Sequence, residues 1–251
     1  MLNLENIDVT LGKNTRLERK VLSRLCLNVR EGEFVVVIGG NGAGKSTLFN
    51  LISGFVKADS GKISILDNDV TAASQTYRAK LVSKVMQDPK LGTMSDMTIL
   101  ENMAFALKRG QRRGLGPFAN RARIEMFKEK LSILNTGLEH RLNDLVGNLS
   151  GGQRQTLSII MALLQESKIL LLDEITAALD PASSESIMEL TDRIVRDQKL
   201  TCIMITHNMS HAVKYGDRLL LLKNGSFIKE YDAETKSSMM PAELALEFGD
   251  I

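Results

Sequence analysis

The sequence predicts an α/β protein with a largely parallel sheet, a β-rich N-terminal part and an inserted helical section. The first observation is an apolar run at residues 34–38, followed by a glycine-rich loop and by helical apolar spacing at 48–52. The second is the alternation of helix and strand patterns after residue 150, which is typical of βα units around a parallel sheet. The third is a helical periodicity that lies between these two regions.

Each expected element follows from a local pattern of apolar residues and turn signals. In the N-terminal part we expect strands at residues 2–10, 25–29, 34–38 and 62–66. In the middle, apolar residues at helical spacing predict helices at 99–107 and 124–134. After residue 150 we expect helices at 151–165, 184–196 and 209–214, and strands at 169–172, 201–206 and 218–222.

The composition favours a folded cytoplasmic protein that does not act on nucleic acid. The 251 residues, 43 % of them hydrophobic, provide enough chain for a substantial core. A net charge of +2 with few aromatic residues is too mild to indicate DNA or RNA binding. Apolar stretches are too short to span a membrane, and the charged N-terminus does not resemble a signal peptide. Cys26 and Cys202 have apolar, strand-like neighbours, so we expect buried free thiols in a reducing compartment.

Residues 39–46 contain the pattern G-x-x-x-x-G-K-S, which is typical of the phosphate-binding loop of nucleotide hydrolases. Glycines let backbone N–H groups approach phosphate oxygens closely, and the following helix directs its positive end toward them. We expect Lys45 to reach the β- and γ-phosphates, Ser46 to bind Mg²⁺ and Thr47 to donate to the α-phosphate. The predicted phosphate-binding residues are Gly39, Gly40, Asn41, Gly42, Ala43, Gly44, Lys45, Ser46 and Thr47.

Two adjacent carboxylates follow the apolar strand expected at 169–172. Ligands of open α/β sheets bind at the carboxyl ends of the strands, which is where Asp173 and Glu174 are predicted to lie. Asp173 would hold Mg²⁺, directly or through water, and Glu174 would act as the general base that polarises the attacking water. An ordinary acidic turn after a strand is the alternative, and the intact phosphate loop argues against it.

A second glycine-rich segment precedes the helix expected at 155–164. It consists of Leu149, Ser150, Gly151, Gly152 and Gln153, and it offers a further cluster of backbone donors at the positive end of a helix. Together with the phosphate loop and the Asp173-Glu174 strand, in this order, this Leu-Ser-Gly-Gly-Gln segment resembles the ATP-binding subunits of ATP-binding cassette (ABC) transporters. The resemblance covers nearly the whole chain.

The resemblance implies a P-loop NTPase fold of ABC type, with an N-terminal antiparallel β subdomain and an inserted helical subdomain. Residues 1–251 would form one domain. Its nucleotide-binding core and β subdomain would comprise 1–86 and 166–233, the helical subdomain 87–165, and the C-terminal tail 234–251. It further implies a head-to-tail homodimer with two sandwiched ATP molecules. Each ATP would lie between the phosphate loop of one subunit and residues 149–153 of the other.

The resemblance also assigns roles to three further residues. Gln87 would sense Mg²⁺ and water and contact the membrane subunit, Asp180 would communicate between the two sites, and His207 would lie near the γ-phosphate. The implied catalytic set is therefore Lys45, Gln87, Glu174 and His207, and the implied Mg²⁺ ligands are Ser46, Gln87 and Asp173. By contrast, we expect His140 and His211 to be surface residues.

The sequence departs from the family pattern at Leu11, because relatives usually carry an aromatic residue there that stacks on adenine. Leu11 would contact the base through aliphatic surface only, which weakens the preference for adenine. A basic stretch at 108–117, which includes Arg112 and Arg113, is a second distinctive feature. It is either a solvated loop or a contact with the membrane partner or with anionic lipid headgroups.

The basic stretch, Gln87-Asp88-Pro89 and Thr206-His207-Asn208 together resemble the standalone bacterial ATPases of amino-acid uptake systems of the tryptophan or tyrosine type. The resemblance implies an ATP-hydrolysing importer subunit on the cytoplasmic face of the inner membrane. Its partners would be permease subunits and a solute-binding protein. Two alternatives stay open, namely an ATPase of lipid export or trafficking and a single-cassette protein of cell division. The resemblance implies that the solute does not touch this subunit, so this chain does not determine which solute is transported.

Overall fold

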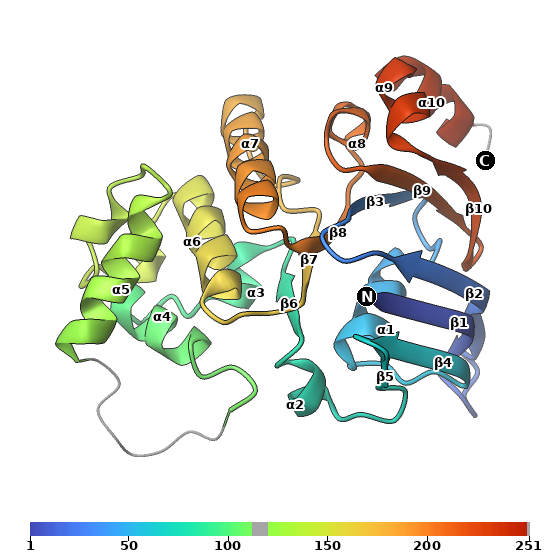
Figure 1. The fold of residues 1–251 in the computed structure, drawn as a ribbon, viewed down its shortest axis with the longest axis horizontal. Coiled ribbons are helices and arrows are strands. Elements are labelled where there is room, and N and C mark those ends of the chain that lie inside the picture. Colours follow the sequence, from blue (N-terminus) through green and yellow to red (C-terminus); the bar gives the residue numbers. More distant parts are fainter. Residues whose placement is uncertain (112–119, 250–251) are drawn as a thin grey trace.

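A six-stranded sheet forms the centre of the molecule, in the strand order β10-β9-β3-β8-β7-β6 (Figure 1). The computed structural model describes residues 1–111 and 120–249. The five strands from β9 to β6 run parallel, and β10 pairs with β9 in the antiparallel direction. The largely parallel sheet predicted from the sequence is therefore confirmed. The strands are β3 (Phe34–Gly39), β6 (Val82–Val85), β7 (Ile169–Asp173), β8 (Thr201–Ile205), β9 (Arg218–Lys223) and β10 (Ser226–Tyr231).

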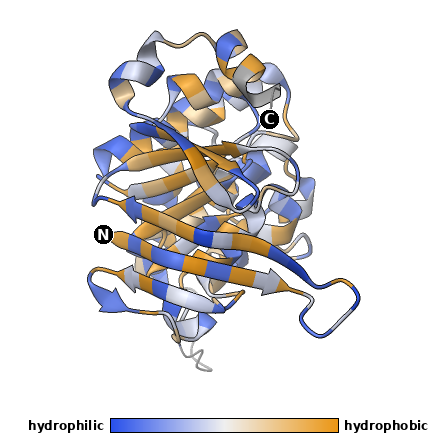
Figure 2. Cartoon of the chain, turned by 90° about the vertical axis from the view of Figure 1, so that its right-hand side faces the viewer, coloured by the Kyte–Doolittle hydropathy of each residue, from blue (hydrophilic) through white to orange (hydrophobic). Residues whose placement is uncertain are grey.

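A second sheet is antiparallel and has the order β2-β1-β4-β5. Figure 2 shows hydrophilic and hydrophobic residues alternating along its strands, whereas the central sheet is mainly hydrophobic. This contrast arises because helices and the second sheet cover both faces of the central sheet, but one face of the antiparallel sheet meets solvent. Its strands are β1 (Leu2–Leu11), β2 (Arg19–Val29), β4 (Ser60–Ile65) and β5 (Asn68–Asp69).

Alternate residues of the central strands enter two separate hydrophobic cores. Val35 and Val37 of β3 face a core shared with the antiparallel sheet and with helix α1 (Lys45–Ser53). Val36 and Ile38 face the opposite core, which contains residues of α7 (Pro181–Asp197) and α8 (Met209–Lys214). Since neighbouring residues of a strand point to opposite faces, this continuous apolar run fills both cores.

A third hydrophobic core lies among the helices between β6 and β7. Phe127, Leu131 and Met103 are fully buried in it, together with residues of α6. The division of the chain near residues 86 and 165 stays a prediction. The elements that lie between the two strands are α3 (Pro89–Gly92), α4 (Ile99–Ala106), α5 (Arg121–Ser132), η1 (Leu138–His140), η2 (Val146–Asn148) and α6 (Gly151–Leu163).

Arg109 fastens the helical section to the central part of the chain. Its guanidinium donates to the carbonyl oxygens of Ala79 and Ala162, both at 3.2 Å, and to Oγ of Ser167 at 2.7 Å. This member of the predicted basic stretch is therefore engaged inside the protein, and burial lowers the pKa of its guanidinium. Arg112 and Arg113, on which the prediction of a membrane contact depends, lie outside the described residues.

Residues near the C-terminus pack on the second core rather than forming only a polar tail. Leu244, on α10 (Pro241–Gly249), is fully buried there. Lys236, on α9 (Ala233–Ser238), is also buried and donates to the carbonyl oxygens of Tyr215 and Gly216, the latter at 2.7 Å. A buried lysine is rarely foreseeable from sequence, because a lysine in a polar stretch normally lies in solvent.

Two sequence expectations about exposure are wrong. Cys26 is exposed, because residues of β2 alternate between the core and solvent and this position faces outward. Cys202 is buried as expected, and burial raises the pKa of its thiol. His211 is only 4 % exposed, although it was expected at the surface.

In the part of the chain that the structure describes, no helix is long and apolar enough to cross a membrane.

Candidate functional site

The phosphate loop joins β3 to α1, as predicted. Gly44 precedes the first helical residue and has φ 109°, and a Cβ there would lie 2.8 Å from Cδ2 of Leu22. Only glycine therefore fits this position without displacing β2. The backbone N–H groups at the start of α1 face the loop, where the helix dipole favours an anion.

Lys45 folds back over the phosphate loop. Its Nζ donates to the carbonyl oxygen of Gly39 at 2.7 Å and to that of Gly40 at 3.1 Å, and the residue is 7 % exposed. Burial lowers the pKa of this ammonium, and the charges of Glu174 and Asp173 oppose the shift. Lys45 is thus a desolvated cation at the place where phosphate groups would bind.

Glu174, Gln87 and His207 meet at the carboxyl ends of three adjacent parallel strands, β7, β6 and β8. Nε2 of His207 lies 2.9 Å from Oε1 of Glu174, and Nε2 of Gln87 donates to Oε2 at 3.1 Å. Both carboxylate oxygens therefore have a partner. Glu174 has φ 47°, a left-handed conformation that is uncommon for a non-glycine residue. Its N–H donates to the carbonyl oxygen of Ile205 at 3.0 Å, which anchors this conformation to β8.

A cavity of about 480 Å³ lies between the phosphate loop and this triad. Two of its lining residues, Arg19 and Val21, come from the start of β2 and were not predicted as site residues. Their signal would have been the pairing of β2 with β1, because Arg19 is the partner of Leu11 across the two strands. The lining residues are Arg19, Val21, Asn41, Gly42, Gly44, Lys45, Ser46, Thr47, Gln87, Glu174 and His207.

Leu11 does not line this cavity among the described residues, although it is 39 % exposed at the end of β1. Arg19 takes the nearer position, with its guanidinium 3.5 Å from the carbonyl oxygen of Gly42. A cationic, planar side chain therefore lies beside the phosphate loop, and the contact of Leu11 with adenine stays a prediction.

The residues predicted to hold Mg²⁺ supply oxygen atoms from neighbouring elements. The hydroxyl of Ser46 and the amide of Gln87 line the cavity. Asp173, at the end of β7, is held in an ion pair in which Nζ of Lys84 lies 2.9 Å from its Oδ2. Hydroxyl, amide and carboxylate oxygens are hard donors of the kind that Mg²⁺ prefers, so this set fits the ion. The described residues contain no cluster of three or more His, Cys, Asp and Glu side chains that could hold a metal.

The Leu-Ser-Gly-Gly-Gln segment forms the capped start of α6. Oγ of Ser150 accepts from the N–H of Gln153, and the side chain of Gln153 accepts from the N–H of Ser150, both at 3.2 Å. This reciprocal cap satisfies two backbone donors. Of the described residues, none from 149–153 lines the phosphate cavity of the same chain. Asp180 does not line it either, and instead caps α7 by accepting from the N–H of Ser183 at 3.0 Å.

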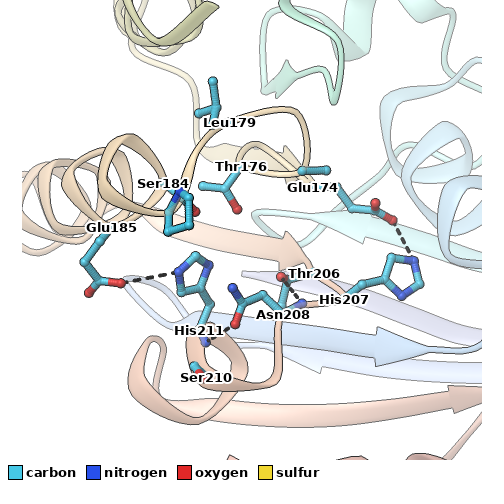
Figure 3. Close-up of a pocket in the computed structure, with 12 residues that line it drawn as sticks. Glu174, Thr176, Leu179, Ser184, Glu185, Thr206, His207, Asn208, Ser210 and His211 are labelled. Carbon is cyan, nitrogen blue, oxygen red and sulfur yellow. Dashed lines mark hydrogen bonds and ion pairs between the residues drawn. The ribbon is translucent and has the colours of Figure 1, made fainter.

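A second cavity of about 380 Å³ lies on the other side of the Glu174–His207 pair and shares both residues (Figure 3). His211 is buried at its wall, with Nε2 3.4 Å from Oε2 of Glu185. Burial lowers the pKa of this imidazole, and Glu185 opposes the shift. Asn208 follows His207 in the chain, and its side chain accepts from the backbone N–H of His211 at 3.1 Å, which caps α8.

The chain is similar to known proteins over most of its length. Residues 22–177 match the sequence family described as "ABC transporter". The chain belongs to the ABC transporter family. It is 40 % identical over 248 residues to the tyrosine transport ATP-binding protein of Clostridioides difficile, covering 99 % of this chain and 98 % of that protein. It is 33 % identical over 237 residues to the thiamine import ATP-binding protein ThiQ of Photorhabdus laumondii, covering 94 % of this chain and 92 % of that protein.

Solved structures of ABC cassettes share the fold. The dimeric post-hydrolysis structure of the ATP-binding cassette MJ0796, bound to ADP and Pi, superposes with a TM-score of 0.79 at 29 % identity. That match covers 93 % of this chain and 99 % of MJ0796. The ATP-binding cassette MJ1267 superposes with a TM-score of 0.82 at 26 % identity, covering 99 % and 98 % of the two chains. The predicted ABC fold, with its antiparallel sheet beside a largely parallel one, is confirmed.

Proposed function

We propose that this ABC protein hydrolyses ATP and uses the reaction to drive import of a small solute through a separate permease. ATP hydrolysis is supported by one observation, which is that Gln87, Glu174 and His207 meet beside the phosphate loop. Phosphoryl transfer to water needs positioning and charge neutralisation more than covalent catalysis. This arrangement offers both within one cavity.

The polar residues in and beside the cavity have distinct tasks in the proposed reaction. Glu174 accepts a proton from the attacking water, and Gln87 and His207 hold the two oxygens of its carboxylate. Lys45 turns from the loop carbonyls to the β- and γ-phosphates, which replace those carbonyls as partners of its ammonium. Bound Mg²⁺, held by Ser46, Gln87 and Asp173, would neutralise charge on the phosphate oxygens.

The active unit in this proposal is a head-to-tail homodimer. In the single chain, residues 149–153 lie away from the phosphate cavity. The cap uses the N–H groups of Ser150 and Gln153, and those of Gly151 and Gly152, at the start of α6, would donate to an ATP held by a second copy. The dimeric MJ0796 structure with ADP and Pi supports this arrangement by analogy. Asp180, at the start of α7, would communicate between the two sites. Loss of the γ-phosphate would then favour opening of the dimer.

The names of the relatives favour uptake of a small solute, and several of them are named for an amino acid. The most similar protein described above is named for tyrosine transport, and another relative, MetN of Streptococcus agalactiae, for methionine import. The cassette would sit peripherally on the cytoplasmic face of a bacterial inner membrane. Its partners there would be permease subunits and, outside the membrane, a solute-binding protein.

The test is purification of the Glu174→Gln variant from its native membranes with ATP, followed by identification of the co-purified proteins. The variant would bind ATP without hydrolysing it and would therefore stay with its membrane partner. We expect a permease to co-purify whose gene neighbours one for a solute-binding protein. Recovery of lipid-pathway or cell-division proteins would overturn import and leave ATP hydrolysis standing. Failure of the unmodified protein to release phosphate from Mg·ATP would overturn the enzymatic part.

A further inference from the structure

Lys84 has no task in the proposed reaction, although it forms an ion pair with Asp173. Lys84 lies on β6 and pairs in register with Leu171, so that Asp173 is its diagonal neighbour on the same face of the sheet. Nζ of Lys84 is 2.9 Å from Oδ2 of Asp173. The two side chains are 13 % and 14 % exposed, which makes this pair much less solvated than an ordinary surface salt bridge.

The surroundings hold the ammonium of Lys84 in this place. It lies 3.5 Å from Oδ1 of Asn50 and 5.7 Å from the ring centroid of Phe49, both on the side of α1 that faces the sheet. Among the described residues, Asp173 is the only carboxylate that pairs with Lys84. The ammonium of Lys84 therefore lies between α1 and β7, in contact with Asp173, the predicted Mg²⁺ ligand.

The charges at the strand ends require such a partner. Asp173 and Glu174 are adjacent carboxylates, and both are largely withdrawn from water. Glu174 has His207 and Gln87 as its partners. A poorly solvated carboxylate without a counterion is costly, so Asp173 needs a cation whenever no metal is bound.

We propose that Lys84 is a tethered counterion of Asp173, which replaces the divalent cation in the metal-free site and lowers the affinity of the site for that cation. The proposal rests on the proposed function, in which Asp173 holds Mg²⁺. Lys84 acts through Asp173 and is a positioning residue. Its fixed charge repels an arriving cation, while its bond to Oδ2 leaves Oδ1 of the carboxylate for the metal.

The test is titration of the nucleotide-free protein with Mn²⁺ alone, with free Mn²⁺ followed by electron paramagnetic resonance. We expect Lys84→Met to bind Mn²⁺ more tightly than the unmodified protein, by about fivefold or more. Lys84→Arg keeps the charge and should bind as the unmodified protein does. Adding Asp173→Asn to Lys84→Met should remove the gain, because the gain depends on the carboxylate.

A second measurement separates this role from a purely structural one. Thermal unfolding of Lys84→Met should show a larger loss of Tm in EDTA than in Mg²⁺, because the metal can replace the missing ammonium. Lys84→Gln serves as a second variant if Lys84→Met does not fold. Equal losses of Tm in both conditions would mean that the lysine only supports packing, and would overturn the proposal.

The remaining outcomes also decide the matter. Unchanged or undetectable Mn²⁺ binding in every variant, or weaker binding in Lys84→Met, would overturn the counterion role. Phosphate release from Mg·ATP by the unmodified protein is measured in parallel. If it is present while the Mn²⁺ result fails, only this inference fails. If it is absent, the proposed function fails instead.

Discussion

The imidazole of His207 and the carboxylate of Glu174 face each other across adjacent parallel strands, with Nε2 and Oε1 2.9 Å apart. Each residue lies just past the carboxyl end of its strand, so their separation is set by the sheet rather than by a flexible loop. Gln87 completes the arrangement from β6. This rigid positioning of a carboxylate beside a phosphate-binding loop leads to the first prediction.

Replacing Glu174 with Gln should lower the rate of ATP turnover by about a hundredfold or more, since the amide cannot accept a proton from water. ATP affinity should stay within about threefold of the original, because the phosphate loop is unchanged. Phosphate release and calorimetric ATP binding measure the two effects. Turnover near the original rate would exclude Glu174 as the general base. His211→Phe, at the second cavity, is the comparison variant and should retain most of the activity.

Replacing Leu11 with Tyr should tighten ATP binding by about fivefold, corresponding to about 1 kcal/mol of aromatic stacking. Leu11 ends β1 opposite Arg19, which lines the phosphate cavity, so a longer aromatic side chain can reach toward a bound base. Leu17→Tyr is the matched control, because Leu17 is 84 % exposed in the connection between the same two strands. Equal ATP affinity in the Leu11 variant and the control would show that this strand end does not contact the base.

Replacing Arg78 with Met should lower the free energy of unfolding by about 3 kcal/mol. The buried guanidinium donates to the carbonyls of Leu51 at 2.5 Å and Val70 at 2.7 Å, and to those of Ile52 and Thr71 at longer distances. It thereby satisfies carbonyls at the end of α1, the helix that follows the phosphate loop. Urea unfolding of this variant, with exposed Lys80→Met as control, checks the effect. A loss no larger than that of the control would contradict it.

Lys236 should make stability rise with pH. Burial lowers the pKa of Lys236 from 10.5 to about 8, so the folded protein releases this proton at a lower pH than the unfolded chain does. Between these two values the unfolded state binds more protons, and the stability contributed by this residue increases with pH. Below about pH 8 Lys236 is protonated in both states, so the full cost of burying the charged ammonium lowers the stability of the folded protein.

Urea unfolding at the two ends of this pH window measures that effect. The free energy of unfolding of the unmodified protein, minus that of Lys236→Met, should increase toward the alkaline end. Lys57→Met, an exposed lysine, corrects for general effects of alkaline pH on both states. A difference that stays constant over the window would mean that Lys236 keeps its proton in the folded protein.

Much of the site could be predicted because its chemistry demands particular residues in a particular order. The glycines of residues 39–44, Lys45 and the carboxylates after β7 each follow from local patterns that strand ends and helix starts impose. Gln87, Asp180 and His207 carry no such local signal. They were assigned through the family resemblance alone, and the structure brings Gln87 and His207, but not Asp180, to Glu174.

The features that escaped prediction depend on contacts between distant segments. Arg19 reaches the cavity only because β2 pairs with β1, and Lys84 meets Asp173 only because β6 pairs with β7. His211 and Lys236 are buried where α8 and α9 pack on β3 and β9. No periodicity in a single sequence records such pairings, because they are decided by tertiary packing.

Arg154 connects the start of α6 to the segment that follows Gln87. This 6 % exposed side chain donates through Nε to Oγ1 of Thr93 at 2.8 Å, and it also bonds to Oγ of Ser95. These bonds to a buried guanidinium tie the segment to α6, so the two cannot shift independently without breaking them. A displacement of residues 88–95 would therefore move residues 150–153 with them, as parts of one rigid unit.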